Sequence, residues 1–453
     1  MNLDSAFEFF NFVICGWLFP VFLIGVGVFL SVRLAFLQVR KIGSVFRSTI
    51  FNRSAKSDKT PRGSLSTRES ISTALASTIG TGSIVGVSIA IYKGGPGAVF
   101  WMWIGAFLGM AIKYSEIVLA ILYRSKNHCE FSVGGPMYYL RDGLGLKTLA
   151  VFFSVFCILA CFGMGNTVQA NAITSSLENH FQWNRQVIAT VLSIIVGVVV
   201  LGGVRRIASF NAKLVPIMSF LYVFCCLLVI GRNFTHLPAV FHQIFKEAFR
   251  APSVAGGVSS FGIFVSMQNG FSKAMFSNEA GLGSAPIAHG SGGNKNPIVE
   301  GFWGIFEVFF TTVVICTLTA LSILCTSVVG SAGGAERLTY DAFNSVFPQF
   351  GGALVSVSTV LFALSTILGW GFYGESCLSF LLKKDRMMIR IFRVLFVIAV
   401  YFGSVGSISL IWNLSEVVNV CMAIPNLIGI LFLSGQVAEV TKKYFNEKCL
   451  SKK

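Results

Sequence analysis

The chain has 453 residues, of which 54% are hydrophobic and only 12% are charged, and its mean hydropathy is +0.74. This composition excludes the soluble globular classes and indicates an integral membrane protein. The formal net charge of +16 would suggest nucleic acid as the partner of a soluble protein, but here we expect a lipid bilayer and no nucleic acid, because membrane topology explains the positive charge better.

Eleven apolar stretches are each long enough to cross a bilayer. In chain order they cover approximately residues 10–32, 69–92, 97–123, 147–175, 186–204, 211–231, 257–289, 297–330, 350–382, 388–411 and 415–440. If the N-terminus lies outside, 27 lysines and arginines fall in segments on the inner side and 6 in segments on the outer side. This asymmetry predicts a multi-pass protein with its N-terminus outside and its C-terminus in the cytoplasm.

A polar, charged segment at residues 52–67 contains a proline and a glycine, and it predicts a flexible cytoplasmic linker after the first helix. The other ten stretches divide into five and five, and each half begins with an interrupted helix, at Thr78–Gly82 and at Gln268–Gly270. Five helices per half place the halves in opposite orientations. The expected fold class is therefore an all-α polytopic membrane protein with 11 transmembrane helices, one N-terminal helix plus a 5+5 inverted repeat. The expected units are residues 1–68 (first helix and linker), 69–232 (first repeat), 233–441 (second repeat) and 442–453 (basic cytoplasmic tail).

The interrupted helix of the first half, Ser72 to Gly86, places three glycines and six serines or threonines inside an apolar stretch. Gly80 and Gly82 are only two positions apart, and each weakens a helix by roughly 1 kcal/mol relative to alanine. In a bilayer, unwound backbone is tolerated only where it lines a cavity or is buried in protein. Half-helices that meet at such a break present N–H groups to an anion and carbonyl groups to a cation, which is typical of secondary transporters. The alternative is close helix packing, because Gly82 and Gly86 also form a small-residue interface pattern.

Charged residues inside the apolar stretches are costly in hydrocarbon, so we expect their side chains to face the protein interior or water. The glutamates concerned are Glu116, Glu279, Glu307, Glu375 and Glu416. Lys113 and Glu116 lie three residues apart, and we expect them to form an ion pair near the cytoplasmic end of their helix. Lys273 is a candidate partner for Glu279, and any of these glutamates could carry a proton.

Six sequence strings resemble the bacterial and archaeal alanine/glycine:cation symporter family, also described as sodium:alanine symporters. In chain order they are TALASTIGTGSIVGV (73–87), GGPGAVFWMW (94–103), GGPMYYL (134–140), FSNEAGLGSAPIAH (276–289), STILGWGFYGE (365–375) and MAIPNLIGIL (422–431). The resemblance implies a leucine-transporter-type fold in a bacterial inner membrane. It also implies uptake of small neutral amino acids with Na⁺ as the coupling ion. The chain departs from the family at Ser83, where the family usually has an asparagine whose amide lies near a cation in related folds.

A zwitterionic amino acid needs partners for its carboxylate and for its ammonium group. We expect the N–H groups of Thr81 and Gly82, at the start of the second half-helix, to bind the carboxylate, with Ser83 beside them. The carbonyl groups of Asn269 and Gly270, together with the Asn269 amide, are expected to hold the ammonium group. The alternative for Asn269 and Gly270 is an ordinary helix kink.

Two further side chains are candidates for the substrate cavity. Gln169 lies in a polar run within an apolar stretch, and a buried amide there either faces a cavity or bonds a neighbouring helix. Trp370 lies about twenty residues into its stretch, too deep for an interfacial anchor, so we expect it to form a wall that limits substrate size.

Sodium prefers several hard oxygen ligands, such as backbone carbonyls and hydroxyls. The adjacent hydroxyls of Ser365 and Thr366 are the candidates on the eighth helix of the ten-helix core. Resemblance to the common sodium site of the fold implies that the carbonyl groups of Ala76, Ile79 and Phe362 complete the set. The alternative is that both hydroxyls donate to the preceding turn of their own helix.

The leading hypothesis is a sodium-driven symporter for alanine, glycine or a similar small neutral amino acid. Proton coupling and amino-acid exchange are the alternatives on the same scaffold. A channel would need a continuous polar pore, whereas these stretches contain discrete polar breaks. A membrane enzyme would need a nucleophile–base pair or a metal site, and we expect no histidine or cysteine with suitable carboxylate partners.

Overall fold

The computed structural model describes residues 14–50, 65–126, 132–250, 262–326, 328–329, 334–383, 385–406 and 409–450. Most of the expected linker at 52–67 and part of the basic tail lie outside these residues. The described chain is helical except for loops, an isolated bridge between Leu65 and Gly292, and a short antiparallel pair of strands, β1 (Ser125–Lys126) and β2 (Ser132–Val133).

The helices are α2 (Phe19–Arg33), α3 (Leu37–Arg40), α4 (Ile42–Thr49), α5 (Thr67–Thr78), α6 (Val85–Gly94), α7 (Gly97–Leu122), α8 (Pro136–Tyr138), α9 (Lys147–Phe162), α10 (Val168–Phe181), α11 (Arg185–Val200), α12 (Val204–Arg232), α13 (Leu237–Ala248), α14 (Ile263–Asn278), α15 (Ala285–Gly290), α16 (Pro297–Val308), α17 (Thr317–Cys325), α18 (Leu338–Val346), α19 (Gly351–Leu381), α20 (Arg386–Val405) and α21 (Ser409–Leu450). Two π-helical segments, Gly163–Thr167 and Phe309–Cys316, join α9 to α10 and α16 to α17.

Among the described residues, eight helical segments are long and apolar enough to cross a bilayer. A ninth span forms if α5 and α6, which are bent by 54° at their break, are taken together. The other two expected stretches differ in form, because α11 is shorter and the stretch at 257–289 is divided between α14 and α15. The helical multi-pass architecture is therefore confirmed, while the count of eleven helices and the inverted repeat remain predictions.

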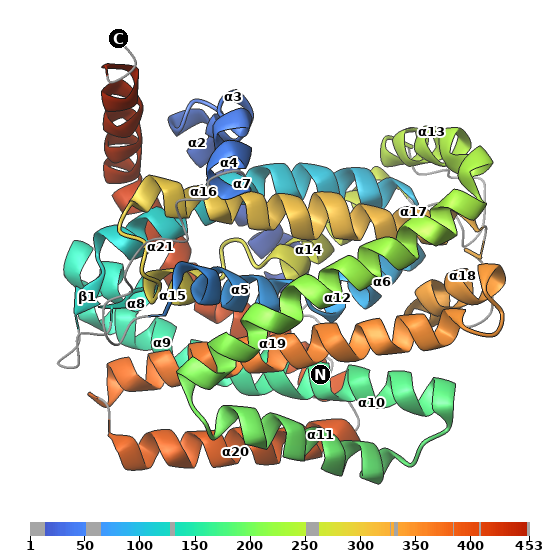
Figure 1. Cartoon of the computed structure of the whole chain (residues 1–453). Helices are drawn as coiled ribbons and strands as arrows, with labels where there is room; N and C mark the ends of the chain where they lie inside the picture. The colour runs from blue at the N-terminus through green and yellow to red at the C-terminus, as the bar shows by residue number, and fades with distance from the viewer. Residues whose placement is uncertain are drawn as a thin grey trace, which may run out of the picture.

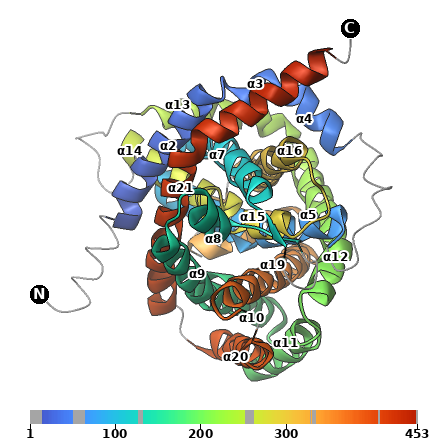
Figure 2. The same cartoon turned by 90° about the vertical axis from the view of Figure 1, so that its left-hand side faces the viewer.

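The long helices run roughly side by side and form one bundle (Figure 1). Helices α13 and α18 lie at one end of this bundle, and α8 and β1 lie at the opposite end (Figure 1). Seen along the bundle, α15 lies near the centre with α5 beside it, whereas α11 and α20 form a pair at the periphery (Figure 2). Large apolar side chains such as Phe220 and Phe432 are about three-quarters exposed, as expected for a surface in contact with lipid.

The second helix break lies at residues 279–284, so the prediction of a break at Gln268–Gly270 is wrong. Helix α14 continues through those residues and ends at Asn278, after which Glu279, Gly281 and Gly283 adopt positive φ angles of 54°, 90° and 79°. The glycine at 270 serves helix packing instead. A Cβ atom there would lie 2.4 Å from the carbonyl oxygen of Ala98, so only glycine lets α14 approach α7 this closely.

The buried charges are paired differently from the sequence expectation. Lys113 is fully buried and its Nζ lies 3.1 Å from Glu307 Oε2, whereas Glu116 accepts a hydrogen bond from the backbone N–H of Gly281. Lys273 lies 3.8 Å from Glu416 and not beside Glu279. Both expected pairs, Lys113 with Glu116 and Lys273 with Glu279, are therefore wrong, because helices distant in sequence bring nearer partners.

Candidate functional site

Helix α5 begins with a capping box and ends in the first break. The Ser66 hydroxyl accepts from the backbone N–H of Glu69, and the Glu69 carboxylate accepts from the backbone N–H of Ser66. After Thr78 the backbone leaves helical geometry at Ile79 (φ −84°, ψ 74°), makes a 3-10 turn over Thr81–Ser83 and resumes as α6. The prediction of an interrupted helix at this place is confirmed.

The two glycines at the break permit close approach of neighbouring helices. A Cβ atom on Gly80 would lie 2.6 Å from Thr366 Oγ1 on α19, and one on Gly82 would lie 2.7 Å from the ring of Phe276 on α14. Both distances are shorter than Cβ atoms tolerate, so the break is packed between α19 and α14. Unwinding and close packing, which the sequence offered as alternatives, therefore occur together here.

Thr81 and Gln169 meet directly, because the Thr81 hydroxyl donates to Gln169 Oε1 at 2.9 Å. Gln169 in turn donates to the carbonyl of Met164, in the π-helical segment before α10. Both side chains are 2% exposed. Of the two alternatives for Gln169, the structure shows the bond to a neighbouring helix. Its partner Thr81 lines a cavity, whereas Gln169 itself is not among the residues that line it.

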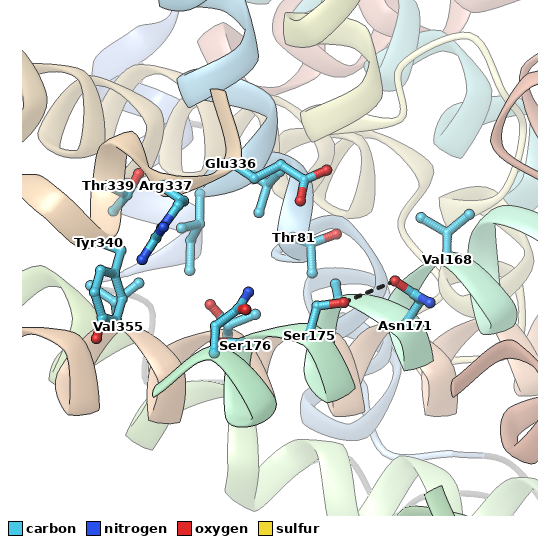
Figure 3. A pocket seen from close by; sticks show the side chains of 15 residues that line it. Thr81, Val168, Asn171, Ser175, Ser176, Glu336, Arg337, Thr339, Tyr340 and Val355 are labelled. Carbon is cyan, nitrogen blue, oxygen red and sulfur yellow. Dashed lines mark hydrogen bonds between the residues drawn. The ribbon is translucent and has the colours of Figure 1, made fainter. Parts of the chain in front are cut away.

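This cavity extends from the break toward the end of the bundle that carries α18 (Figure 3). Asn171, Ser175 and Ser176 approach it from α10, and Glu336 and Arg337 approach it from the opposite side (Figure 3). The remaining lining residues are Thr81, Ile84, Val85, Val168, Ala172, Asn179, Thr339, Tyr340, Val355 and Thr359. The cavity is thus lined by many polar side chains and reaches the unwound backbone of the first break at Thr81.

The predicted cation ligands converge between α5 and α19. Ser365 Oγ lies 3.1 Å from the carbonyl oxygen of Ala76 and 2.8 Å from that of Phe362. Thr366 Oγ1 lies 3.2 Å from the carbonyl oxygen of Ala76 and 3.0 Å from the carbonyl oxygen of Phe362. Ile79 is fully buried at the start of the unwound segment. Two hydroxyls and two carbonyls therefore form one buried oxygen cluster, in which the hydroxyls bond both their own helix and α5.

Trp370 is fully buried and is fixed by a residue that the sequence reading did not place in the site. Its indole N–H donates to Glu279 Oε1 at 2.9 Å, and Glu279 Oε2 accepts from the Ser284 hydroxyl at 2.6 Å. A Cβ atom on Gly165 would lie 2.4 Å from the Trp370 side chain, so the indole fills the space beside the π-helical segment that leads to Gln169. The string SNEAGLGS, with its two glycines and its glutamate, is the sequence signal for this second break.

The structure does not bring Asn269 and Gly270 to this site. Asn269 donates to the carbonyl of Val265 on its own helix, and its Cβ faces Gly94 at the end of α6. Ser83 ends the 3-10 turn of the first break, and its hydroxyl lies 3.1 Å from the hydroxyl of Ser277 on α14. An ammonium partner at Asn269 and Gly270 is therefore a wrong prediction, which followed from the misplaced helix break.

Comparison with known sequences gives the family. Residues 1–453 match the sodium:alanine symporter family. The chain is 38% identical to the sodium/alanine symporter AgcS of Methanococcus maripaludis, and the match covers 99% of this chain and 98% of that protein. It is 34% identical to the probable sodium/glutamine symporter GlnT of Bacillus subtilis, over 94% of this chain and 88% of that protein.

Comparison with solved structures agrees on the fold. The structure of MhsT in complex with L-phenylalanine matches with a TM-score of 0.57 at 13% identity, over 82% of this chain and 90% of that one. At this identity the likeness shows the leucine-transporter-type fold alone. Together with the whole-length family match and the helix breaks described above, it establishes that the chain belongs to the sodium:alanine symporter family and is a membrane transporter, not an enzyme.

Proposed function

We propose that the chain is a sodium-coupled symporter that carries alanine, glycine or a similar small neutral amino acid into the cell. One observation carries the proposal: a single unwound segment, Ile79 to Ser83, contacts the oxygen cluster through Gly80 and the cavity through Thr81. Ion and substrate would thus bind to neighbouring residues of the same flexible backbone. Such sharing is what makes the affinity for one depend on the presence of the other.

The substrate carboxylate is proposed to bind the N–H groups of Thr81 and Gly82, where α6 begins after the break. The carbonyl oxygen of Phe276, near the C-terminal end of α14, faces Gly82 and suits the ammonium group. Gln169 holds the Thr81 side chain in place, and the buried Trp370 packs against Gly165 in the π-helical segment that leads to Gln169. The close packing of Gly82 against Phe276 supports a substrate with a small side chain.

The coupling sodium ion is proposed to bind the Ala76 and Phe362 carbonyls and the Ser365 and Thr366 hydroxyls, with the Ile79 carbonyl as the fifth ligand. Each hydroxyl has only one hydrogen, and it lies near two carbonyl oxygens at once. The two carbonyl oxygens therefore compete for the single hydrogen of each hydroxyl. A cation among these oxygens would bind the hydroxyl lone pairs and the carbonyl oxygen that is left without a hydrogen. Because Ser83 replaces the family asparagine at the neighbouring position, we propose a single coupled sodium ion.

The proposed orientation follows the charge asymmetry. With the N-terminus outside and the C-terminus in the cytoplasm, the cavity at the α18 end of the bundle opens outward and is the entry path. The proposed units are an N-terminal helix with a linker, two oppositely oriented five-helix repeats (69–232 and 233–441) and a basic tail. The broken helices α5–α6 and α14–α15, one in each half, support this division.

The test is uptake of radiolabelled alanine by proteoliposomes under an imposed sodium gradient or proton gradient. We expect saturable uptake that needs sodium and is competed by glycine more strongly than by glutamine. Uptake that follows the proton gradient and ignores sodium would establish proton coupling in place of this proposal. Uptake that requires an amino acid inside the vesicle and no ion gradient would establish exchange.

A further inference from the structure

His289, on the inner half of the second broken helix, lies between two glutamates of α16. Its Nδ1 is 2.6 Å from Glu300 Oε1, and its Nε2 is 2.8 Å from Glu307 Oε1. All three side chains are 0% exposed. The sequence expectation that no histidine has carboxylate partners is therefore wrong.

Counting hydrogens shows that this triad holds an extra proton. A neutral imidazole has one N–H donor and one acceptor nitrogen, while an ionised carboxylate only accepts. Both ring nitrogens of His289 face carboxylate oxygens at hydrogen-bond distance, so two acceptors would meet unless one more hydrogen is present. That hydrogen lies either on the second ring nitrogen or on one of the carboxyl groups. In both cases the triad binds one proton more than a neutral histidine with two carboxylates.

The surrounding charges do not remove this requirement. Lys113 of α7 lies 3.1 Å from Glu307 Oε2, and Asn294 donates to Glu300 Oε2 at 2.8 Å. Arg124 donates to the backbone carbonyls of His289 and Asn294 and reaches neither ring nitrogen. Lys113 forms an ion pair at the outer oxygen of Glu307, Asn294 bonds the outer oxygen of Glu300, and Arg124 bonds the backbone. The two inner carboxylate oxygens therefore face the imidazole.

Other ionisable groups on the neighbouring elements are also engaged elsewhere. Glu116 of α7 accepts from Asn426 and Gly281. The Glu69 carboxylate of α5 accepts from the Ser66 hydroxyl. Glu279, ahead of α15, accepts from Trp370 and Ser284. None of these carboxylates has a hydrogen bond to the triad within the described part of the chain.

A metal ion does not explain the arrangement. Zinc bonds of about 2.0–2.1 Å at a tetrahedral angle hold ligand atoms more than about 3 Å apart, beyond the two nitrogen–oxygen distances found here. No group of three or more histidine, cysteine, aspartate or glutamate side chains suited to a metal occurs among the described residues.

We propose that His289, Glu300 and Glu307 form a buried proton-binding site that fastens α15 to α16. Helix α15 follows directly after the second break, at residues 279–284, which contains Glu279, the partner of Trp370. When the proton leaves, an acceptor nitrogen faces an acceptor oxygen in a buried environment, and α15 loosens from α16. The site is filled at low pH and empties as the pH rises, so alkaline pH weakens the attachment of the inner half-helix.

The variant Glu300→Gln separates the proton from the shape of the site. Its amide oxygen can accept from Asn294 while its NH₂ group donates to His289 Nδ1, so a neutral imidazole satisfies every hydrogen bond. The size of the side chain is unchanged. The variant therefore keeps the contact between α15 and α16 and removes the need for the extra proton.

The direct test is ¹⁵N NMR of histidine-labelled protein near pH 8, with His289→Gln to assign the signal among the five histidines. We expect His289 as a doubly protonated imidazolium in the wild type, or as a neutral imidazole together with a protonated carboxyl band in the infrared spectrum. In Glu300→Gln we expect a neutral imidazole and no such band. A neutral imidazole with ionised Glu300 and Glu307 in the wild type would overturn the proposal. This measurement needs no transport, so it stands apart from the proposed function.

The second test is sodium-driven alanine uptake between about pH 7 and about pH 9, with the sodium gradient held constant. We expect wild-type uptake to fall several-fold across this range, while Glu300→Gln keeps an almost flat profile. A parallel decline in both proteins would overturn the assignment of the pH response to the triad.

Discussion

Gly80 and Thr366 are in contact across the interface between α5 and α19, and a Cβ atom on Gly80 would stand 2.6 Å from Thr366 Oγ1. The hydroxyl that meets the broken helix is therefore the same hydroxyl that bonds Ala76 and Phe362 in the oxygen cluster. One residue further along the chain, Thr81 lines the cavity. Under the proposed function, this contact joins the sodium site to the substrate site over a distance of a single peptide unit.

Replacing Gly80 by alanine should therefore damage sodium binding and substrate binding together. The new methyl group would displace the Thr366 hydroxyl or the unwound backbone, and neither is free to move in a buried interface. We expect sodium-driven uptake to fall about tenfold or more, equivalent to about 1.4 kcal/mol per factor of ten. The measurement is initial uptake rate at saturating sodium and alanine.

Gly86→Ala is the matched control for that variant. The nearest atom to a Cβ at this position is 4.0 Å away in Phe276, and the residue lies inside α6, where alanine favours the helix. Its uptake should stay within about twofold of wild type. Equal losses in Gly80→Ala and Gly86→Ala would contradict the role given to the contact with Thr366.

Replacing Thr366 by alanine should weaken sodium binding without disturbing the helix, because alanine is a better helix former than threonine. One neutral oxygen ligand is lost, so the sodium concentration for half-maximal uptake should increase by a factor of between about three and about ten. Alanine affinity at fixed sodium should fall by a reciprocal amount, because the two ligands are linked. The Hill coefficient for sodium should remain near one, as expected for one coupled ion.

Ser358→Ala provides the comparison on the same helix. The Ser358 hydroxyl is buried and donates to the carbonyl of Leu354 within α19, so its loss removes a hydroxyl without touching the oxygen cluster. Its sodium curve should overlay that of wild type. If Thr366→Ala also overlays wild type, the oxygen cluster is not the coupling site.

Much of the architecture could be predicted from the sequence, because the bilayer imposes a minimum length on every apolar span. The first break was predictable too, since Gly80 and Gly82 both weaken the same turn of one helix. The second break was misplaced because Gly270 looks the same in sequence whether it unwinds a helix or lets two helices touch. Only the distance from its position to Ala98 distinguishes the two.

The charged partners could not be predicted for a different reason. Lys113 and Glu307 are 194 positions apart, and the choice of Glu307 over the nearby Glu116 depends on how α7 and α16 pack. His289 and its two glutamates follow no spacing that marks a known site. Hydrophobic periodicity shows which face of a helix is buried, but it does not show which polar group it will meet there.

Membrane orientation can be tested with two variants, each of which carries one introduced cysteine. If the N-terminus is outside, a cysteine at Ser57 lies in the cytoplasm, whereas a cysteine at Glu336 lies at the outer mouth of the cavity. An impermeant thiol reagent added to intact cells should label Glu336→Cys and spare Ser57→Cys. The parent protein measures the background from the eleven native cysteines. The reverse labelling pattern would invert the proposed topology and make the cavity an exit path.

The hydrogen bond between Thr81 and Gln169 should matter for the substrate more than for the ion. Thr81→Val keeps the shape but leaves Gln169 Oε1 buried without its donor, which costs about 1–3 kcal/mol. The alanine KM should rise about tenfold or more. Thr81→Ser retains the donor and should stay near wild type. If valine and serine at this position give the same KM, the hydroxyl has no role in holding the site.

The final prediction concerns the proposed role of Trp370 in limiting substrate size. Its indole is held between the π-helical segment at Gly165 and the carboxylate of Glu279, so its position depends on the second break. Trp370→Ala would open space there, and uptake of labelled alanine should become more sensitive to competition by valine and leucine. Alanine itself should bind more weakly, because packing is lost and Glu279 Oε1 loses its donor.

Two further variants separate these two effects. Trp370→Phe keeps most of the ring volume but removes the N–H group, so it should weaken alanine uptake while leaving the competition profile narrow. Trp103→Ala removes a tryptophan of α7 whose indole bonds Thr317, away from the cavity, and its profile should match wild type. Suppose that unlabelled alanine, valine and leucine inhibit uptake by Trp370→Ala in the same order and to the same extent as in wild type. Trp370 then supports the bundle without facing the substrate. Size selection would then be assigned to Phe276, whose ring lies against Gly82 at the first break.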